Sequence, residues 1–263
     1  MVSSACHGVE GFCGSGVQVH LLSDGAVQEA ARSAGVAMLL VHGLNPWGFS
    51  HWRRVTHENV DLNRNFHDFS RPLPTNAGYD ELAKAILPAT WPPAAESEQR
   101  LQAYAARHGR AALQTAITGG QYTHPDGLFF GGVAPTWSQA TLRQVLRDEA
   151  RVCSRLGWID LHTGLGPSGH GEKIFAGRHE PEALARARAW WGAEVTSVDD
   201  GSSSSAPLEG LMWQAAPQEC PQAEVTGIAL EYGTLPLDQM LNALRRDHWA
   251  AVQQALPHEE RQD

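Results

Sequence analysis

Short apolar runs of strand length alternate along the chain with longer segments of helical spacing, which is typical of an α/β layered fold. The apolar runs predict strands at residues 2–5, 35–41, 157–161 and 225–230. Apolar positions three and four residues apart predict helices at residues 79–87, 96–117, 138–156, 181–194 and 237–256. Ser138 suits a helix N-cap and Pro236 suits a first helical turn. We therefore expect helices packed around a central sheet.

Length and composition favour one compact domain spanning residues 1–263, because 42% hydrophobic content can bury a single large core. No internal repeat or domain boundary is visible. The segment 199–206 (DDGSSSSA) has low complexity, which favours a flexible surface loop over a substrate-contacting role.

Charge and hydropathy argue against nucleic acids and membranes as binding partners. The chain has 20 Lys and Arg against 29 Asp and Glu, a formal charge of -9, which argues against nucleic acid or an anionic membrane. No apolar run approaches the roughly 20 residues of a membrane helix, and the N-terminus lacks the features of a signal peptide. We expect a cytoplasmic protein.

Polar side chains follow the predicted strands at the points where ligands collect in open α/β sheets. His7 follows the first strand, His162 the third and Glu231 the fourth. Glu10 lies three residues after His7, so one helical turn would place both side chains on the same face. Such a pair is usually a solvated surface pair, and His162 has a buried, hydrogen-bonded histidine as its simpler interpretation.

Taken together, His7, Glu10 and His162 have the composition of a catalytic zinc site. Three protein ligands leave a fourth position open for water or a substrate oxygen. Glu231 directly follows an apolar run, where a carboxylate is costly unless it is paired or faces a cleft. As a general base it would take a proton from the attacking water. An α/β protein without a metal is the remaining alternative.

Several motifs in one order carry a resemblance to a known superfamily. They are His7-x-x-Glu10, Asn-Pro-x-Gly-Phe at 45–49 followed by an arginine, Val-Asp-Leu-Asn-Arg-Asn-Phe at 60–66, the strand-ending His162, and Glu-Tyr-Gly-Thr at 231–234. This series resembles the zinc carboxypeptidase superfamily, which includes carboxypeptidase A, succinylglutamate desuccinylase and aspartoacylase. Residues 121–138 are similar to a bacterial subfamily labelled a domain of unknown function.

The resemblance implies a three-layer α/β/α fold with a central mixed, mostly parallel twisted sheet. Members of the superfamily carry several dozen residues before the His-x-x-Glu motif, including edge strands of the sheet. Here the first ligand is residue 7. We therefore expect an N-terminally truncated domain that lacks those edge strands.

The resemblance also implies roles for individual residues. His7, Glu10 and His162 fall on the ligand positions for one Zn²⁺ per chain, and Glu231 falls on the catalytic glutamate. Asn63 and Arg64 fall on the pair that binds the substrate carboxylate. Arg54 matches the arginine that stabilises the oxyanion, although Arg53 could be shifted into that role.

The implied activity is hydrolysis of an amide bond next to a free carboxylate, as in a metallocarboxypeptidase. The substrate would be a peptide or an N-acyl amino acid, since deacylases related to aspartoacylase and the desuccinylase use the same chemistry. A zinc- or peptide-binding relative without turnover is a third possibility, which the presence of Glu231 disfavours.

Overall fold

Five strands form one mixed sheet in the computed structural model, which describes residues 1–178 and 180–255. The strands are β1 (Val2–Ser4), β2 (Leu40–Val41), β3 (Arg155–Gly164), β4 (Gly171–Phe175) and β5 (Glu224–Gly233). Their order is β2-β1-β3-β5-β4, and only β4 runs antiparallel to its neighbour. The predicted α/β class with a mixed, mostly parallel sheet is confirmed.

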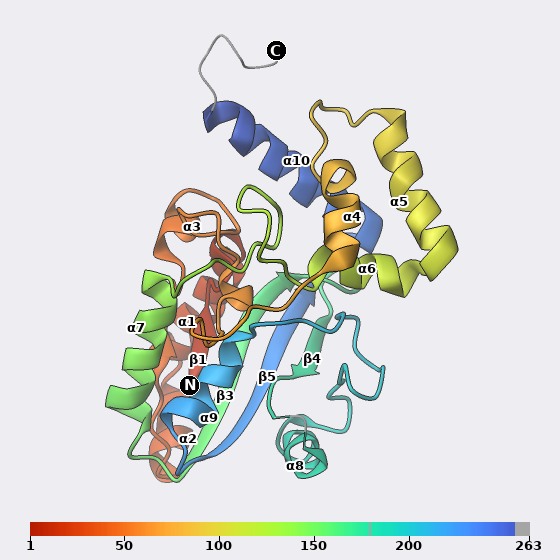
Figure 1. Ribbon diagram of the computed structural model, residues 1–263. Helices are drawn as coiled ribbons and strands as arrows, with labels where there is room; N and C mark the ends of the chain where they lie inside the picture. Colours follow the sequence, from red (N-terminus) through yellow and green to blue (C-terminus); the bar gives the residue numbers. More distant parts are fainter. Residues whose placement is uncertain (179, 256–263) are drawn as a thin grey trace.

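Helices cover the sheet and also form a separate group beyond the carboxyl ends of β3 and β5 (Figure 1). The helices are α1 (Gly11–Ser23), α2 (Gly25–Ser33), α3 (Pro46–Ser50), α4 (Ala77–Ile86), α5 (Ala95–His108), α6 (Arg110–Thr118), α7 (Trp137–Val145), α8 (Pro181–Trp191), α9 (Ala215–Glu219) and α10 (Leu237–Ala255). Shorter helical turns are η1 (Gly8–Glu10), η2 (Leu62–Arg64), η3 (Leu146–Ala150), which continues α7, and η4 (Met212–Gln214).

Alternate residues of β3 enter cores on opposite faces of the sheet, as the two-residue period of a strand requires. Trp158 packs with Leu142 of α7 and the neighbouring residues of α9. Ile159 packs on the other face with Ala187 of α8. Helix α1 also covers this second face, since a Cβ at its Gly14 would lie only 2.5 Å from the Cβ of Ser4. The result is three layers.

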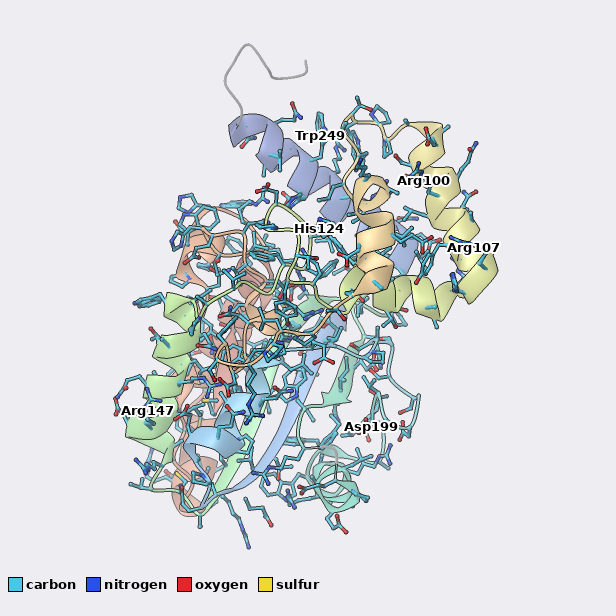
Figure 2. The ribbon with its side chains drawn as sticks, viewed as in Figure 1. Arg100, Arg107, His124, Arg147, Asp199 and Trp249 are labelled. Atoms are coloured by element: carbon cyan, nitrogen blue, oxygen red, sulfur yellow. The ribbon has the colours of Figure 1, made fainter. Side chains whose placement is uncertain are left out.

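The group formed by α4, α5 and α6 has its own buried core, and α10 closes one side of it. Arg245 of α10 donates hydrogen bonds to the carbonyls of Ala85 and Ile86 at 2.8 and 3.0 Å. Trp249 of the same helix donates to the carbonyl of Ala89, and Figure 2 shows it beside the end of α4. Helix α10 is thereby fixed across the carboxyl ends of the strands.

Two predicted helices were wrong in extent. The segment 96–117 is broken into α5 and α6 at Gly109, whose φ of +93° interrupts the helix. The segment 138–156 is capped by Thr136, whose side chain accepts from the amide of Gln139, and not by Ser138. The helical part of this segment ends at Ala150, and its last residues, Arg155 and Leu156, belong to β3.

The strand predicted at residues 35–41 was also mostly wrong, since β2 contains only Leu40 and Val41. The neighbouring strand β1 is only three residues long, so few of its backbone groups can pair with residues 35–39. Val36 is 58% exposed, which also differs from the buried strand that was predicted. The other three predicted strands are present, whereas β4, α1 to α3 and α9 were not predicted.

The remaining predicted helices correspond to α4, α8 and α10 within a few residues, and Leu256 lies outside the described residues. Within the described part of the chain, no helix combines the length and apolar character needed to cross a membrane.

Candidate metal centre and active site

The turn that carries His7 and Glu10 depends on very close backbone packing. Strand β1 ends at Ser4, and Ala5 then adopts a φ of +59°, which redirects the chain. A Cβ at Gly8 would lie 2.2 Å from the carbonyl carbon of Gly48, so the Asn-Pro-x-Gly-Phe segment can pack this closely against η1 only because residue 8 is glycine. His7 and Glu10 are thereby held on one short turn.

His162 and Glu231 reach the same place from the two central strands. Strands β3 and β5 pair in parallel register along their whole length, and this register sets His162 beside Glu231. A hydrogen bond of 3.1 Å from the amide of Thr163 to Oε2 of Glu10 ties β3 to η1. The predicted convergence of these four side chains is what the fold produces.

His7, Glu10 and His162 form a buried donor set for a metal ion. One ligand atom from each lies within 4.8 Å of the others. Nδ1 of His7 is 3.0 Å from Oε1 of Glu10, and Nδ1 of His162 is 3.2 Å from Oε2. Nδ1 of His7 is buried and, despite its short distance to Glu10, makes no well-aligned hydrogen bond with any of the described residues. A metal ion bound at this point would satisfy it.

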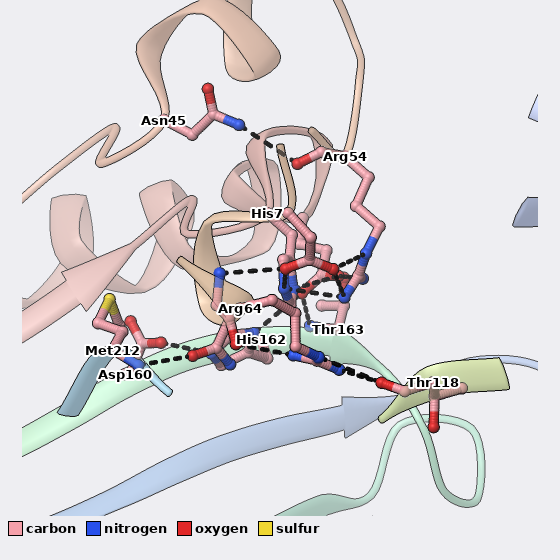
Figure 3. Close-up of polar contacts among 12 residues, drawn as sticks. His7, Asn45, Arg54, Arg64, Thr118, Asp160, His162, Thr163 and Met212 are labelled. Atoms are coloured by element: carbon pink, nitrogen blue, oxygen red, sulfur yellow. Dashed lines mark hydrogen bonds and ion pairs between the residues drawn. The ribbon is translucent and has the colours of Figure 1, made fainter. Parts of the chain in front are cut away.

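A carboxylate holds the other ring nitrogen of each histidine (Figure 3). Nε2 of His7 lies 3.1 Å from Oδ1 of Asp61, and Nε2 of His162 makes a short hydrogen bond with Asp160. A proton on each Nε2 would leave the Nδ1 lone pair free for a metal ion; at His7 this requires Nη2 of Arg54, which lies 2.8 Å from Nε2, to shift, because a guanidinium can only donate. Metal-bound histidines usually have such an outer carboxylate partner. The donor set therefore fits a metal ion.

The buried acidic and basic groups around Glu10 shift one another's pKa values. Burial disfavours the charged form of Glu10, but His7 and His162 outweigh it and hold the pKa of Glu10 well below its usual range. Burial likewise opposes protonation of His162, yet Asp160 raises the pKa of this histidine well above its usual value. The negative charge of Glu10 is therefore balanced by three neighbours, because His7, His162 and Arg54 all lie within ion-pair distance of its carboxylate.

Glu231 behaves differently from the other carboxylates of the site. Burial, reinforced by the negative charge of Glu10, raises its pKa to about 7. Its Oε1 accepts a hydrogen bond of 3.1 Å from the amide of Leu165, which fixes one oxygen. A carboxyl group with a pKa near neutrality can both take up and release a proton under ordinary conditions.

Arg54, and not Arg53, points into the centre. Its guanidinium donates to Glu10 at 2.8 Å and to Asp61 at 3.1 Å, and Nη2 lies 2.8 Å from Nε2 of His7. Arg53 instead contacts the backbone and side chain of Asp247 on α10. The choice of Arg54 agrees with this geometry.

Asn63 and Arg64 are both buried beside the centre. Oδ1 of Asn63 accepts from the amide of Met212, and Arg64 donates to the carbonyls of Thr118 and Asn63 (Figure 3). These bonds fix the plane of the Arg64 guanidinium, which lines the same cavity as His7, Glu10 and His162.

That cavity has a volume of about 420 Å³. Its walls come from η1, η2, the ends of β3 and β5, and α10. The serine-rich loop also contributes Ser205 and Ala206. The loop is anchored by Glu172, whose carboxylate accepts from the amide and hydroxyl of Ser204. Figure 2 shows Asp199 of this loop near β4. The segment 199–206 is a mostly exposed loop, as predicted, and its end at Ser205 and Ala206 reaches the cavity.

Sequence reasoning missed three residues that shape the site. Asp61 lies inside the quoted motif at 60–66 and Asp160 inside the strand predicted at 157–161, and their positions two residues before Asn63 and His162 were the available signal. Phe129 gave no signal, yet its ring centre is 5.3 Å from the guanidinium carbon of Arg54 and 5.7 Å from that of Arg64. Its backbone has a φ of +56°, which is uncommon for a bulky residue.

The fold and the site define an α/β protein with a buried His-Glu-His group suited to a metal ion. The sequence matches the profile of the DUF2817 family, described as a protein of unknown function, over residues 1–263. The chain belongs to this family.

A search of curated proteins found no match. Among solved structures, the chain is similar to one described as a "putative metallopeptidase" from Shewanella amazonensis SB2B, at 16% identity and a TM-score of 0.34. That alignment covers 95% of this chain and 75% of the other. At this TM-score the similarity carries no argument about function.

Proposed function

We propose that this protein is a zinc-dependent hydrolase of the carboxypeptidase A superfamily, which cleaves an amide bond next to a free carboxylate. The observation that carries the proposal is the convergence of two Nδ1 atoms and the Glu10 carboxylate, with both Nε2 atoms held by aspartates. Nitrogen and carboxylate ligands in this combination suit Zn²⁺. A zinc ion bound there would polarise the scissile carbonyl and increase the acidity of water.

The other residues of the cavity have matching roles. Glu231 accepts the proton of the attacking water and returns it to the leaving amine, for which a pKa of about 7 is suitable. Arg54 stabilises the negative charge that develops on the carbonyl oxygen. Arg64 binds the terminal carboxylate through its planar guanidinium, assisted by Asn63. The leading substrate is a peptide, which makes the protein a metallocarboxypeptidase.

Zinc content and substrate release test this proposal together. We would measure zinc per chain in the parent, in His162→Ala and in His20→Ala, a control at an exposed histidine of α1. About one zinc is expected in the parent and the control, and little in His162→Ala. A library of peptides and a panel of N-acyl amino acids would then be assayed with each protein.

Release of carboxyl-terminal residues from peptides would support the carboxypeptidase. Turnover of N-acyl amino acids alone would assign the site to a deacylase, and zinc binding without turnover on either panel would assign it to a binding protein. Folded protein that takes up no zinc would refute the central claim.

A further inference from the structure

An unusual tryptophan lies at the rim of the cavity. Trp52 is 70% exposed and lines the cavity together with Val9. Its backbone has a φ of +59°, a left-handed conformation that bulky side chains rarely adopt. Trp52 therefore combines an exposed indole ring with an unfavourable left-handed backbone conformation. Outliers of this kind gather at binding sites, where the surrounding structure holds them in place.

Trp52 is rigidly connected to the metal-binding turn. The amide of Val9 donates to the carbonyl of Arg53 at 3.0 Å, and the amide of Gly8 donates to that of Arg54 at 3.1 Å. The ring of Phe12, which is 49% exposed, lies 5.2 Å from the ring of Trp52. Phe12 and Trp52 therefore form an aromatic platform, next to the metal-binding residue Glu10.

The order of contacts places this platform at one end of the cavity. Arg54 lies beside Glu10, and the guanidinium groups of Arg54 and Arg64 both lie over the ring of Phe129. Arg64 in turn bonds to Thr118 of α6 at the other end. A substrate whose carboxylate is bound by Arg64 and whose reacting carbonyl lies at Glu10 and Arg54 must extend its acyl side toward the platform.

We infer that the aromatic platform of Phe12 and Trp52 binds an apolar group on the acyl side of the cleaved bond. This inference rests on the proposed function. The platform selects substrates with a hydrophobic penultimate side chain or a long apolar acyl group over those with a short acyl group. Trp52 lines the cavity together with Val9, and the exposed Phe12 beside it extends this apolar surface beyond the cavity lining, so an apolar group that reaches them is favoured by its burial.

Binding and turnover of one substrate series test the platform. The series is acetyl-, hexanoyl- and 3-phenylpropanoyl-phenylalanine, so that only the acyl group changes. Calorimetric titration uses zinc-loaded protein carrying Glu231→Gln, alone or with Trp52→Ala or Trp137→Ala. Trp137 is 64% exposed on α7 and is absent from the cavity lining, so it controls for loss of an exposed tryptophan. kcat/KM for the same three compounds is measured in protein that keeps Glu231, alone or with Trp52→Ala or Trp137→Ala.

We expect affinity to rise about tenfold or more from the acetyl to the 3-phenylpropanoyl compound, a preference lost in Trp52→Ala and kept in Trp137→Ala. An equal affinity for all three compounds, or an unchanged preference in Trp52→Ala, would overturn the inference. Selective binding without turnover would support the platform as a binding site for apolar acyl groups and refute the proposed hydrolysis. Turnover at equal rates for all three compounds would support the proposed hydrolysis and refute the binding role of the platform. Absence of both binding and turnover would refute both.

Discussion

Replacing Glu231 by glutamine should change how the stability of the metal-free protein depends on pH. Burial raises the pKa of this carboxyl from 4.5 to about 7, so the folded protein favours its protonated form. The resulting stabilisation is complete below pH 4.5 and is lost as pH rises through 7. A difference of about 2.5 pKa units, at about 1.4 kcal/mol each, corresponds to about 3 kcal/mol. Glutamine is neutral throughout and loses none of it.

Urea unfolding at pH 5 and pH 8, with a chelator present, would measure this effect. Relative to the parent, Glu231→Gln should gain about 2–3 kcal/mol of unfolding free energy between the two pH values. Glu29→Gln, at an exposed carboxylate of α2, controls for the loss of one negative charge. A stability difference that does not change with pH would refute the account of Glu231. Added zinc should reduce the pH dependence, because a nearby cation favours the ionised carboxylate.

Three further substitutions test other parts of the site. Asp160→Asn should weaken zinc binding by about 10–100-fold, because it removes the carboxylate partner of a ligand; competition with a chelating dye measures this. Gly8→Ala should lower the free energy of unfolding by about 2–3 kcal/mol through a backbone clash, as measured in urea. Gly16→Ala, whose added Cβ meets nothing within 4 Å, should instead be neutral or slightly stabilising. Arg64→Lys should raise KM about tenfold or more for carboxylate substrates while zinc content stays constant, which steady-state kinetics and elemental analysis check together.

The candidate site was more predictable from the sequence than the elements around it. His7 follows β1, and His162 and Glu231 lie near the carboxyl ends of β3 and β5. Because parallel strands end at the same edge of a sheet, their convergence followed from local pattern. Arg54 could be preferred to Arg53 only by resemblance. The physical reason for the preference is the hydrogen bond of Arg54 to Asp61, a contact between residues whose positions no periodicity predicts.

The errors in the fold arose where tertiary packing decides local structure. Helix α1 contains Gly11, Gly14 and Gly16, a composition that disfavours a helix, yet Gly11 and Gly14 allow it to approach Ala5 and Ser4 closely. The break at Gly109 depends on one positive φ within an otherwise helical pattern. Neither a close approach nor a single dihedral angle is visible in hydrophobic periodicity.

The pairing of β3 with β5 has a further consequence for how this protein can vary. His162 and Glu231 are kept adjacent by the ladder of two central strands, whereas the loops at residues 165–170 and 192–211 contribute Leu165, Ser205, Ala206 and Leu208 to the cavity wall. Loops tolerate changes in length and composition far better than paired strands do. Changes in these two loops would therefore reshape the cavity without moving Glu231 away from His162, so under the proposed function substrate selectivity can vary while the chemistry is kept.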